Sequence, residues 1–108
     1  MSLNVFIPES PPGAYRITQT SVAVTATSQQ VLPANPSRRY LQWMVVGTAD
    51  VTVTAGADPA VVGQGIVYQS TGSGKQGASE TFQGGAPITA FQCIAAASGS
   101  TLIIWEGM

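Results

Sequence analysis

Several short segments of the chain alternate apolar and polar residues with a period of two, which is the pattern of β-strands. The strongest segment, residues 36–46, opens with turn-forming residues and two arginines and continues through large apolar side chains. Its odd positions from Leu41 onward share one face of a pleat, and the even face is also apolar except at Gln42. Because both faces favour burial, the segment predicts a central strand of a sandwich or barrel, or a strand at a subunit interface.

Shorter segments that favour extended structure surround this strand, and those over 14–19, 21–27 and 51–54 show clear alternation. The shorter segments are residues 14–19, 21–27, 30–32, 51–54, 66–68, 78–82, 91–95 and 101–105. Short connections predict that the central strand forms a hairpin with 51–54, with valines inward and threonines outward, and that 91–95 and 101–105 form another. The Ser- and Gly-rich residues 69–77 predict a surface loop. About eight short strands without helical periodicity predict an all-β fold, an antiparallel β-sandwich or small barrel.

The first residues differ from the rest of the chain. Prolines at positions 8, 11 and 12 disfavour sheet pairing and favour an extended path. A short apolar group precedes them, formed by Val5, Phe6 and Ile7. We therefore expect an extended N-terminal arm over residues 1–13 and a single β domain over residues 14–108. A docking arm and a poorly ordered terminus both fit this composition.

Charge is scarce in this sequence. Charged residues make up 8% and hydrophobic residues 44%, and the formal net charge is −1. Because a monomer normally keeps charge on its surface, this composition predicts a homo-oligomer or a component of a larger assembly. The sequence has no basic run for nucleic acid or an anionic membrane, and no apolar run of the roughly 18 residues that cross a bilayer. We expect neither partner, and with no signal-peptide pattern at the N-terminus we expect folding in the cytoplasm.

The side chains that carry most enzyme chemistry are missing. With no His and a single Cys, the chain cannot assemble a Ser-His-Asp or Cys-His arrangement, or a zinc cluster of His and Cys. Its acidic residues occur singly beside turns, which favours solvated or capping roles over a pair of glycosidase carboxylates. The segment 72–75 lacks the spacing and the following helix of a phosphate-binding loop. We therefore expect no enzymatic activity, no cofactor and no metal site.

Two arginines, two tryptophans and the single cysteine have an expected structural role, and the arginines and tryptophans also have a possible role in binding. Arg38 and Arg39 are adjacent and point to opposite faces of a strand, so they do not form one anion clamp. Each is expected either in a local bond that holds the strand entry or in an intersubunit contact. Trp43 and Trp105 are expected in the core, with a stacking platform for sugars as the alternative, and Cys93 is expected as a small buried hydrophobe.

Four stretches of the sequence carry a resemblance to a known family. They are Asn35–Trp43, Gly47 with Val51–Val53, Phe82–Pro87 leading into Ala90–Phe91, and Gly99–Gly107. Together, over residues 31–107, they resemble small virion structural proteins of tailed bacteriophages. The resemblance implies a compact, non-enzymatic β domain in the virion, a capsid decoration (cement) protein or the base of a head fibre. It further implies the major capsid protein as partner and a homo-oligomer, with a trimer favoured.

On this interpretation the arm attaches the protein to its partner, by adding a short strand or an apolar plug to the capsid or to a sister subunit. The candidate partner-contact residues are Val5, Phe6, Ile7, Tyr15 and Arg16, and the candidates for strand-entry or intersubunit pairing are Arg38 and Arg39. The alternative function is a receptor- or carbohydrate-binding module of a head or tail fibre.

Overall fold

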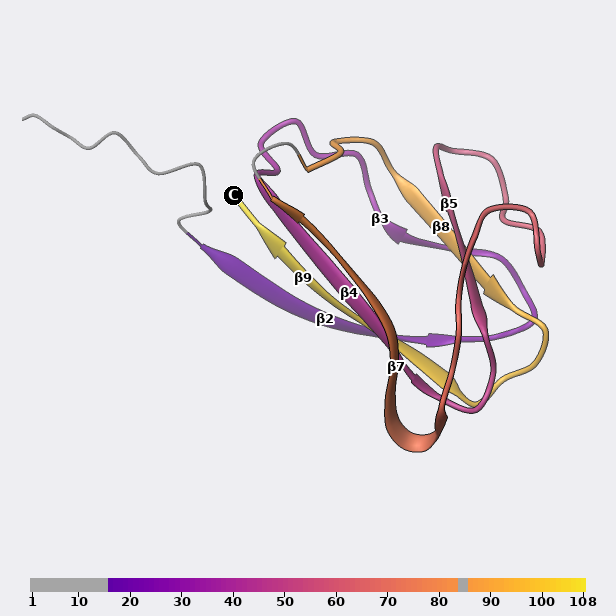
Figure 1. The fold of residues 1–108 in the computed structure, drawn as a ribbon. Coiled ribbons are helices and arrows are strands. Elements are labelled where there is room, and N and C mark those ends of the chain that lie inside the picture. Colours follow the sequence, from indigo (N-terminus) through magenta and orange to yellow (C-terminus); the bar gives the residue numbers. More distant parts are fainter. Residues whose placement is uncertain (1–15, 84–85) are drawn as a thin grey trace, which may run out of the picture.

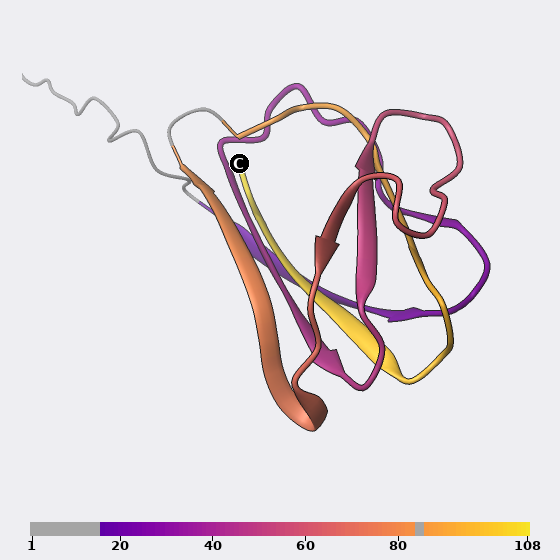
Figure 2. The ribbon, with the colours of Figure 1, turned by 45° about the vertical axis from the view of Figure 1, so that its right-hand side comes forward.

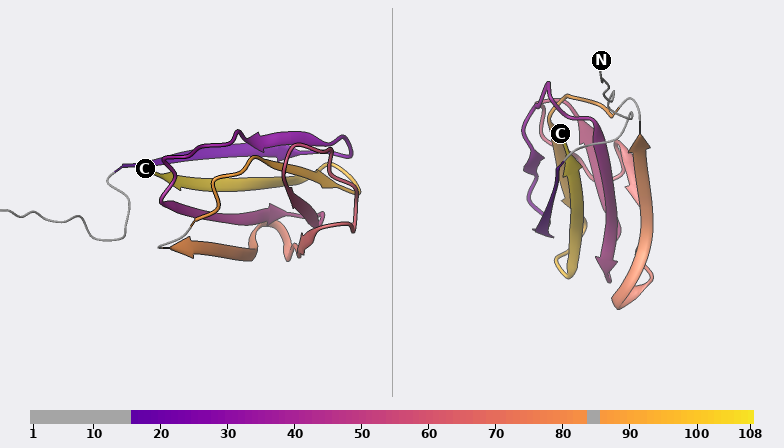
Figure 3. Two further views of the ribbon diagram at one scale, coloured as in Figure 1. Left: turned by 90° about the horizontal axis from the view of Figure 1, so that it is seen from above. Right: turned by 90° about the vertical axis from the view of Figure 1, so that its left-hand side faces the viewer.

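The computed structural model describes residues 16–83 and 86–108, and its regular elements there are all β-strands (Figure 1). The strands are β2 (Ile17–Val24), β3 (Gln29–Leu32), β4 (Tyr40–Gly47), β5 (Val51–Ala55), β6 (Ile66–Tyr68), β7 (Gly72–Gln83), β8 (Phe91–Ala95) and β9 (Ser100–Gly107). They form two 4-stranded sheets, β2-β9-β4-β7 and β3-β8-β5-β6, which lie face to face (Figure 3). The prediction of an all-β antiparallel sandwich is confirmed, whereas the predicted arm, residues 1–13, lies outside the described residues.

The strand order is that of a jelly roll. Counted from β2, one sheet holds the first, eighth, third and sixth strands, and the other holds the second, seventh, fourth and fifth. The chain therefore changes sheet at every connection except the one between β5 and β6, which is the double Greek key arrangement. Jelly rolls serve many unrelated proteins, so this fold by itself assigns no function.

Both predicted hairpins are wrong. β4 and β5 belong to different sheets, as do β8 and β9, so residues 48–50 and 96–99 are corners at which the chain crosses the sandwich. At the first corner Gly47 has a φ of +138°, and a Cβ at this position would lie 2.2 Å from the carbonyl oxygen of Gly99 at the second. A short loop permits either a hairpin or a corner, and the pairing of β4 with β7 and β9 decides between them.

Burial alternates strictly along β4, the strand predicted to be central. Leu41, Trp43 and Val45 point into the sandwich and are at most 1% exposed. The even positions from Tyr40 to Val46 are only half-buried on the outside of the sheet. The sequence predicted that both faces of this strand are buried. Within the described residues only the inward face is fully buried.

Trp43 lies at the centre of the core. Its ring makes edge-to-face contacts with Phe91, Phe82 and Tyr68, at centroid distances of 4.9, 5.6 and 6.0 Å. Aromatic pairs in this geometry add stability beyond the area that they bury. Small and aliphatic side chains from both sheets complete the core, among them Val24, Leu41, Val45, Val51, Cys93, Leu102 and Ile104.

The outside of the sheet β3-β8-β5-β6 is partly covered by the chain itself. Residues 56–65 fold across it, where the N–H of Gly63 donates to the Thr52 hydroxyl at 3.1 Å and the N–H of Ala60 donates to the Ser28 hydroxyl at 2.7 Å. Thr52 is therefore buried, although its place in the alternation predicted an exposed side chain. The outside of the other sheet has no comparable cover within the described residues.

β7 begins inside the segment predicted to be a loop. The stretch from Gly72 is curled and runs into the edge of its sheet (Figure 2). The Thr71 hydroxyl donates to the carbonyl oxygen of Gln76 at 2.6 Å, and the N–H of Ala78 donates to that of Gln69 at 2.8 Å. These hydrogen bonds hold the start of β7 in an extended form, although its Ser- and Gly-rich composition is typical of loops.

Candidate interaction surface

The outside of the sheet β2-β9-β4-β7, here called the outer face, is built by alternate residues of four paired strands. In antiparallel sheets, directly opposite residues point to the same side. The described side chains that the register places on the outer face are Ile17, Gln19, Ser21 and Ala23 of β2, Thr101, Ile103 and Trp105 of β9, Tyr40, Gln42, Met44 and Val46 of β4, and Gln76, Ser79 and Thr81 of β7. None of these side chains carries a charge.

Trp105 is at the middle of the outer face, opposite Gln19 on one side and Gln42 on the other. Its indole Nε1 donates to the Gln19 Oε1 atom at 3.0 Å. The hydroxyl of Tyr40 donates to the Gln42 Oε1 atom at 2.5 Å. Amide groups thus orient both rings without any ion, and Trp105 and Tyr40 remain half-buried in the single chain.

The prediction that Trp105 belongs to the core is wrong. The inward positions of β9 are taken by Leu102 and Ile104, which are 0% exposed, and Ile103 and Trp105 point outward. Because residues 102–105 are apolar on both faces, the alternation could not show which face was the core. The burial pattern of β4, read with the β4–β9 register, is what assigns the outward side.

A second group of exposed apolar residues lies on the far side of the sandwich, in and beside β6. Val61, Val62, Ile66 and Val67 are 44 to 55% exposed. Their backbone is irregular up to Gly65, with one isolated bridge between Val61 and Gln64. These residues lie in β6 and in the loop before it. They do not form a face of alternate residues on paired strands, as the outer face does.

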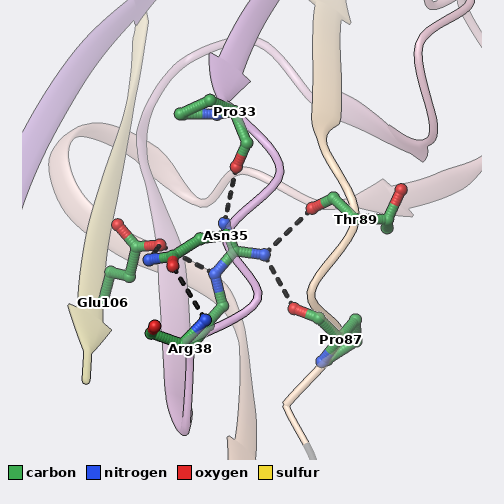
Figure 4. A network of polar contacts seen from close by, with 7 residues as sticks. Pro33, Asn35, Arg38, Pro87, Thr89 and Glu106 are labelled. Carbon is green, nitrogen blue, oxygen red and sulfur yellow. Dashed lines mark hydrogen bonds and ion pairs between the residues drawn. The ribbon is translucent and has the colours of Figure 1, made fainter.

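Arg38 is the buried centre of a polar network that joins three parts of the chain (Figure 4). Its Nε donates to the Glu106 Oε2 atom at 2.8 Å. Its Nη1 donates to the carbonyl oxygens of Pro87 and Thr89 at 2.7 and 2.9 Å, and its Nη2 to that of Pro33 at 2.8 Å. The network fastens the segments that precede β4 and β8 to the end of β9, and it directs these donors to groups of the chain itself.

The other two arginines that the sequence singled out lie near the end of β9. Arg39 is exposed, and its main-chain N–H donates to the carbonyl oxygen of Gly107 at 2.8 Å. Arg16 is also exposed, and its main chain exchanges two hydrogen bonds with Met108. Both arginines are therefore exposed at one end of the sheet, and their partner or intersubunit contacts stay a prediction.

The other predicted contact residues lie outside the described part of the chain. They are Val5, Phe6, Ile7 and Tyr15. Their role as a docking segment therefore stays a prediction from the sequence.

Three further groups that could take part in chemistry are buried or hydrogen-bonded within the fold. The hydroxyl of Tyr68 donates to the Glu80 Oε1 atom at 2.8 Å. The pKa of Tyr68 is raised, mainly by burial and further by this bond to a carboxylate. Burial raises the pKa of the Cys93 thiol to about 11, so at neutral pH the group is a protonated, inaccessible hydrophobe. Asp50 accepts hydrogen bonds from the N–H and the hydroxyl of Ser70.

Two wider features of the described residues bear on possible partners. Residues 16–83 and 86–108 contain no group of three or more His, Cys, Asp or Glu side chains placed to hold a metal ion. The same ranges contain no helix that is long and apolar enough to cross a membrane.

Comparison with known proteins corrects the family suggested by the sequence. No family model and no curated protein matches this chain. A solved structure matches over 96% of this chain and 98% of its own, with 19% sequence identity and a TM-score of 0.42; it is described by the words "Bacillus endospore appendages form a novel family of disulfide-linked pili".

That structure is of a pilus protein, and none of the comparisons returned a virion protein. The identification as a tailed-phage virion protein is therefore corrected. With it go the capsid decoration, cement and head-fibre roles, the receptor- or carbohydrate-binding role on a fibre, the capsid partner and the virion location. Three of the four stretches that carried the resemblance have structural explanations: Gly47 and Gly99 meet at two corners, and Arg38 and Glu106 form an ion pair.

Proposed function

We propose that this chain is a non-enzymatic structural subunit that associates with further copies of itself. The outer face carries this proposal. An antiparallel sheet with one face in solvent normally shows polar and charged residues there, whereas this face alternates Ile103 and Trp105 on β9 with Met44 and Val46 on β4 and carries no charge. A second copy with the same properties is a suitable partner, because two uncharged faces meet without the cost of burying ions.

The chemistry of the described side chains supports a structural role. Glu106 neutralises Arg38, Glu80 accepts from Tyr68, and Cys93 is a buried, protonated thiol. Each of these groups already contacts another part of the protein, so a substrate could reach it only by breaking that contact. The absence of histidine from the sequence removes the commonest general base.

Sedimentation velocity over a range of protein concentrations tests this function. We expect association that is nearly independent of salt, because the surface is uncharged and ionic screening has little to act on. The trimer favoured by the sequence rested on the phage resemblance, and the measured mass replaces it. A chain that stays monomeric and folded at high micromolar concentration contradicts the proposed function.

Two matched substitutions locate the surface. Ile103→Lys places a charge in the middle of the outer face, and Ile66→Lys places the same charge on an apolar residue of β6 that is 55% exposed. The first is expected to weaken association and the second to leave it unchanged, with both variants melting close to the parent temperature. The reverse result would move the surface to the β6 side and contradict the assignment to the outer face.

A further inference from the structure

The described strands leave four sheet edges, formed by β2, β7, β3 and β6. An edge strand presents unpaired N–H and C=O groups, which are a template for a strand from another chain. Soluble proteins usually protect such edges by short length, bulges, charged side chains or proline. The four edges of this fold differ sharply in this respect.

Three of the edges carry such protection. β3 has 4 residues, a register shift between Gln30 and Leu32, and Pro33 directly after it. β6 has only 3 residues. β7 carries Lys75 and Glu80, and its register with β4 shifts twice. A second chain would find no long regular ladder on any of them.

The edge formed by β2 has none of these devices. The strand has 8 residues, ITQTSVAV, without charge or proline. Its register with β9 is continuous from Ile17 to Val24, so no bulge twists it away. Its first five residues are all exposed, and Figure 3 shows it at the border of its sheet.

Hydrogen bonding at the end of the strand shows which backbone groups face this edge. Arg16 and Met108 exchange both of their main-chain hydrogen bonds. In an antiparallel pair such exchanging positions alternate with positions whose groups face away. The even residues of β2 therefore bond β9, and the odd residues Ile17, Gln19 and Ser21 direct N–H and C=O groups to the free edge. At Ala23 the carbonyl oxygen is already taken by the Gln29 side chain, at 2.8 Å.

We propose that the β2 edge binds the β2 edge of a second copy, in an antiparallel pair about a two-fold axis at Gln19. This inference depends on the proposed function and names one of its contacts. Gln19 meets Gln19, and Ile17 meets Ser21, so the three residues with free backbone groups satisfy one another. The two four-stranded sheets become one continuous sheet whose uncharged outer face is doubled in width.

The sequence around this axis is self-complementary. A two-fold antiparallel pair places Arg16 opposite Val22 of the second copy, so the nearest charges are not opposed. The two Arg16 side chains are then roughly 20 Å apart along the ladder, at about 3.4 Å per residue. A closed two-fold contact also uses up the edge in both copies, so this edge does not produce open-ended aggregation.

Ser21→Pro tests the pairing in the full chain. Proline at this position removes an N–H that faces the free edge and no bond to β9, so an edge strand tolerates it. Symmetry removes the bond twice, and we expect the dimer to weaken by roughly 10- to 100-fold in sedimentation equilibrium, with the melting temperature little changed. Ser21→Ala removes the same hydroxyl but keeps the N–H, so the difference between the two variants measures the backbone bond, and we expect Ser21→Ala to dimerise clearly more tightly than Ser21→Pro.

Hydrogen exchange of the unmodified chain gives a second measurement that does not depend on a variant. At high concentration the amides of Ile17, Gln19 and Ser21 are expected to be protected, and on dilution they exchange fast while those of Thr18 and Thr20 stay protected. Fast exchange of all three odd amides in a chain that nevertheless associates overturns the β2 pairing and leaves the proposed function standing. A chain that is monomeric throughout overturns both.

One alternative occupant of the edge is the apolar segment that precedes it in the sequence. Phe6→Asp in the full chain tests it. If this substitution abolishes association while Ser21→Pro preserves it, the second-copy pairing of β2 is wrong and the N-terminal segment is the contact. Normal association of Phe6→Asp together with loss in Ser21→Pro supports the pairing.

Discussion

Arg38 and Glu106 form an ion pair of 2.8 Å in which the arginine side chain is 0% and the glutamate side chain 18% exposed. The two residues are far apart in sequence and come together where the entry to β4 meets the end of β9 (Figure 4). Because the guanidinium is fully withdrawn from water, its charge depends on this one carboxylate and on three carbonyl oxygens. The pair therefore links the entry to β4 with the end of β9.

Glu106→Gln is expected to destabilise the fold by about 3 to 5 kcal/mol, because it leaves a buried guanidinium without a counter-charge. Urea unfolding measures this change. Glu80→Gln is the matched control, since it makes the same chemical change beside a neutral hydroxyl, and its cost should be clearly smaller. Equal costs for the two substitutions would mean that the Arg38 charge is compensated elsewhere.

Trp43→Ala is expected to cost about 3 to 5 kcal/mol, which approaches the whole stability of a small domain. The substitution empties the centre of the core, where the ring touches Tyr68, Phe82 and Phe91. The indole Nε1 is buried and has no hydrogen-bond partner among the described residues, so Trp43→Phe should cost markedly less. A melting temperature of Trp43→Ala within a few degrees of the parent would contradict the central role of this ring.

Comparing Gly47→Ala with Gly56→Ala separates two contributions to the loss of stability: the clash of an added Cβ and the strain of a positive φ. Both glycines have positive φ, +138° and +107°, but a Cβ at Gly47 meets backbone atoms within 2.6 Å and one at Gly56 meets nothing within 4 Å. We expect about 1 to 3 kcal/mol for Gly56→Ala from backbone strain alone, and more than about 4 kcal/mol for Gly47→Ala. Chemical denaturation of both variants measures the difference. Similar values would show that the two corners at Gly47 and Gly99 can move apart.

Cys93 should be unreactive towards thiol reagents in the folded chain and should react at the rate of unfolding. Burial raises its pKa from 9.0 to about 11, so the folded chain holds this proton more tightly than the unfolded chain. The stability linked to the thiol is therefore complete below pH 9 and is lost as the pH rises from 9 to 11. The raised pKa of Tyr68 acts in the same direction.

Thermal melts between neutral pH and pH 11 measure this alkaline loss of stability. Cys93→Ala, although less stable from the start, should lose less stability across that interval than the parent. Rapid labelling of Cys93 under native conditions would contradict its burial.

The alternation of residues was enough to predict an all-β sandwich, because a period of two on short segments separated by Gly, Pro and Asn permits little else. It also predicted that Trp43 is core and that Cys93 is buried. It could not decide the pairing of strands. The corners at 48–50 and 96–99 are as short as hairpin turns, and which sheet the next strand joins depends on contacts with strands distant in the sequence.

The sequence by itself also determined that the surface is poor in charge, since 8% of charged residues cannot cover it. Only the tertiary structure decided where the charges are absent. Arg38 and Glu106 neutralise each other inside the fold, and the register of β2, β9 and β4 gathers Gln19, Trp105 and Met44 on one outer face. The physical reason is that alternation sorts the residues of a strand into two faces but does not determine which face points into the core. That direction is set by which side of each sheet meets the other sheet.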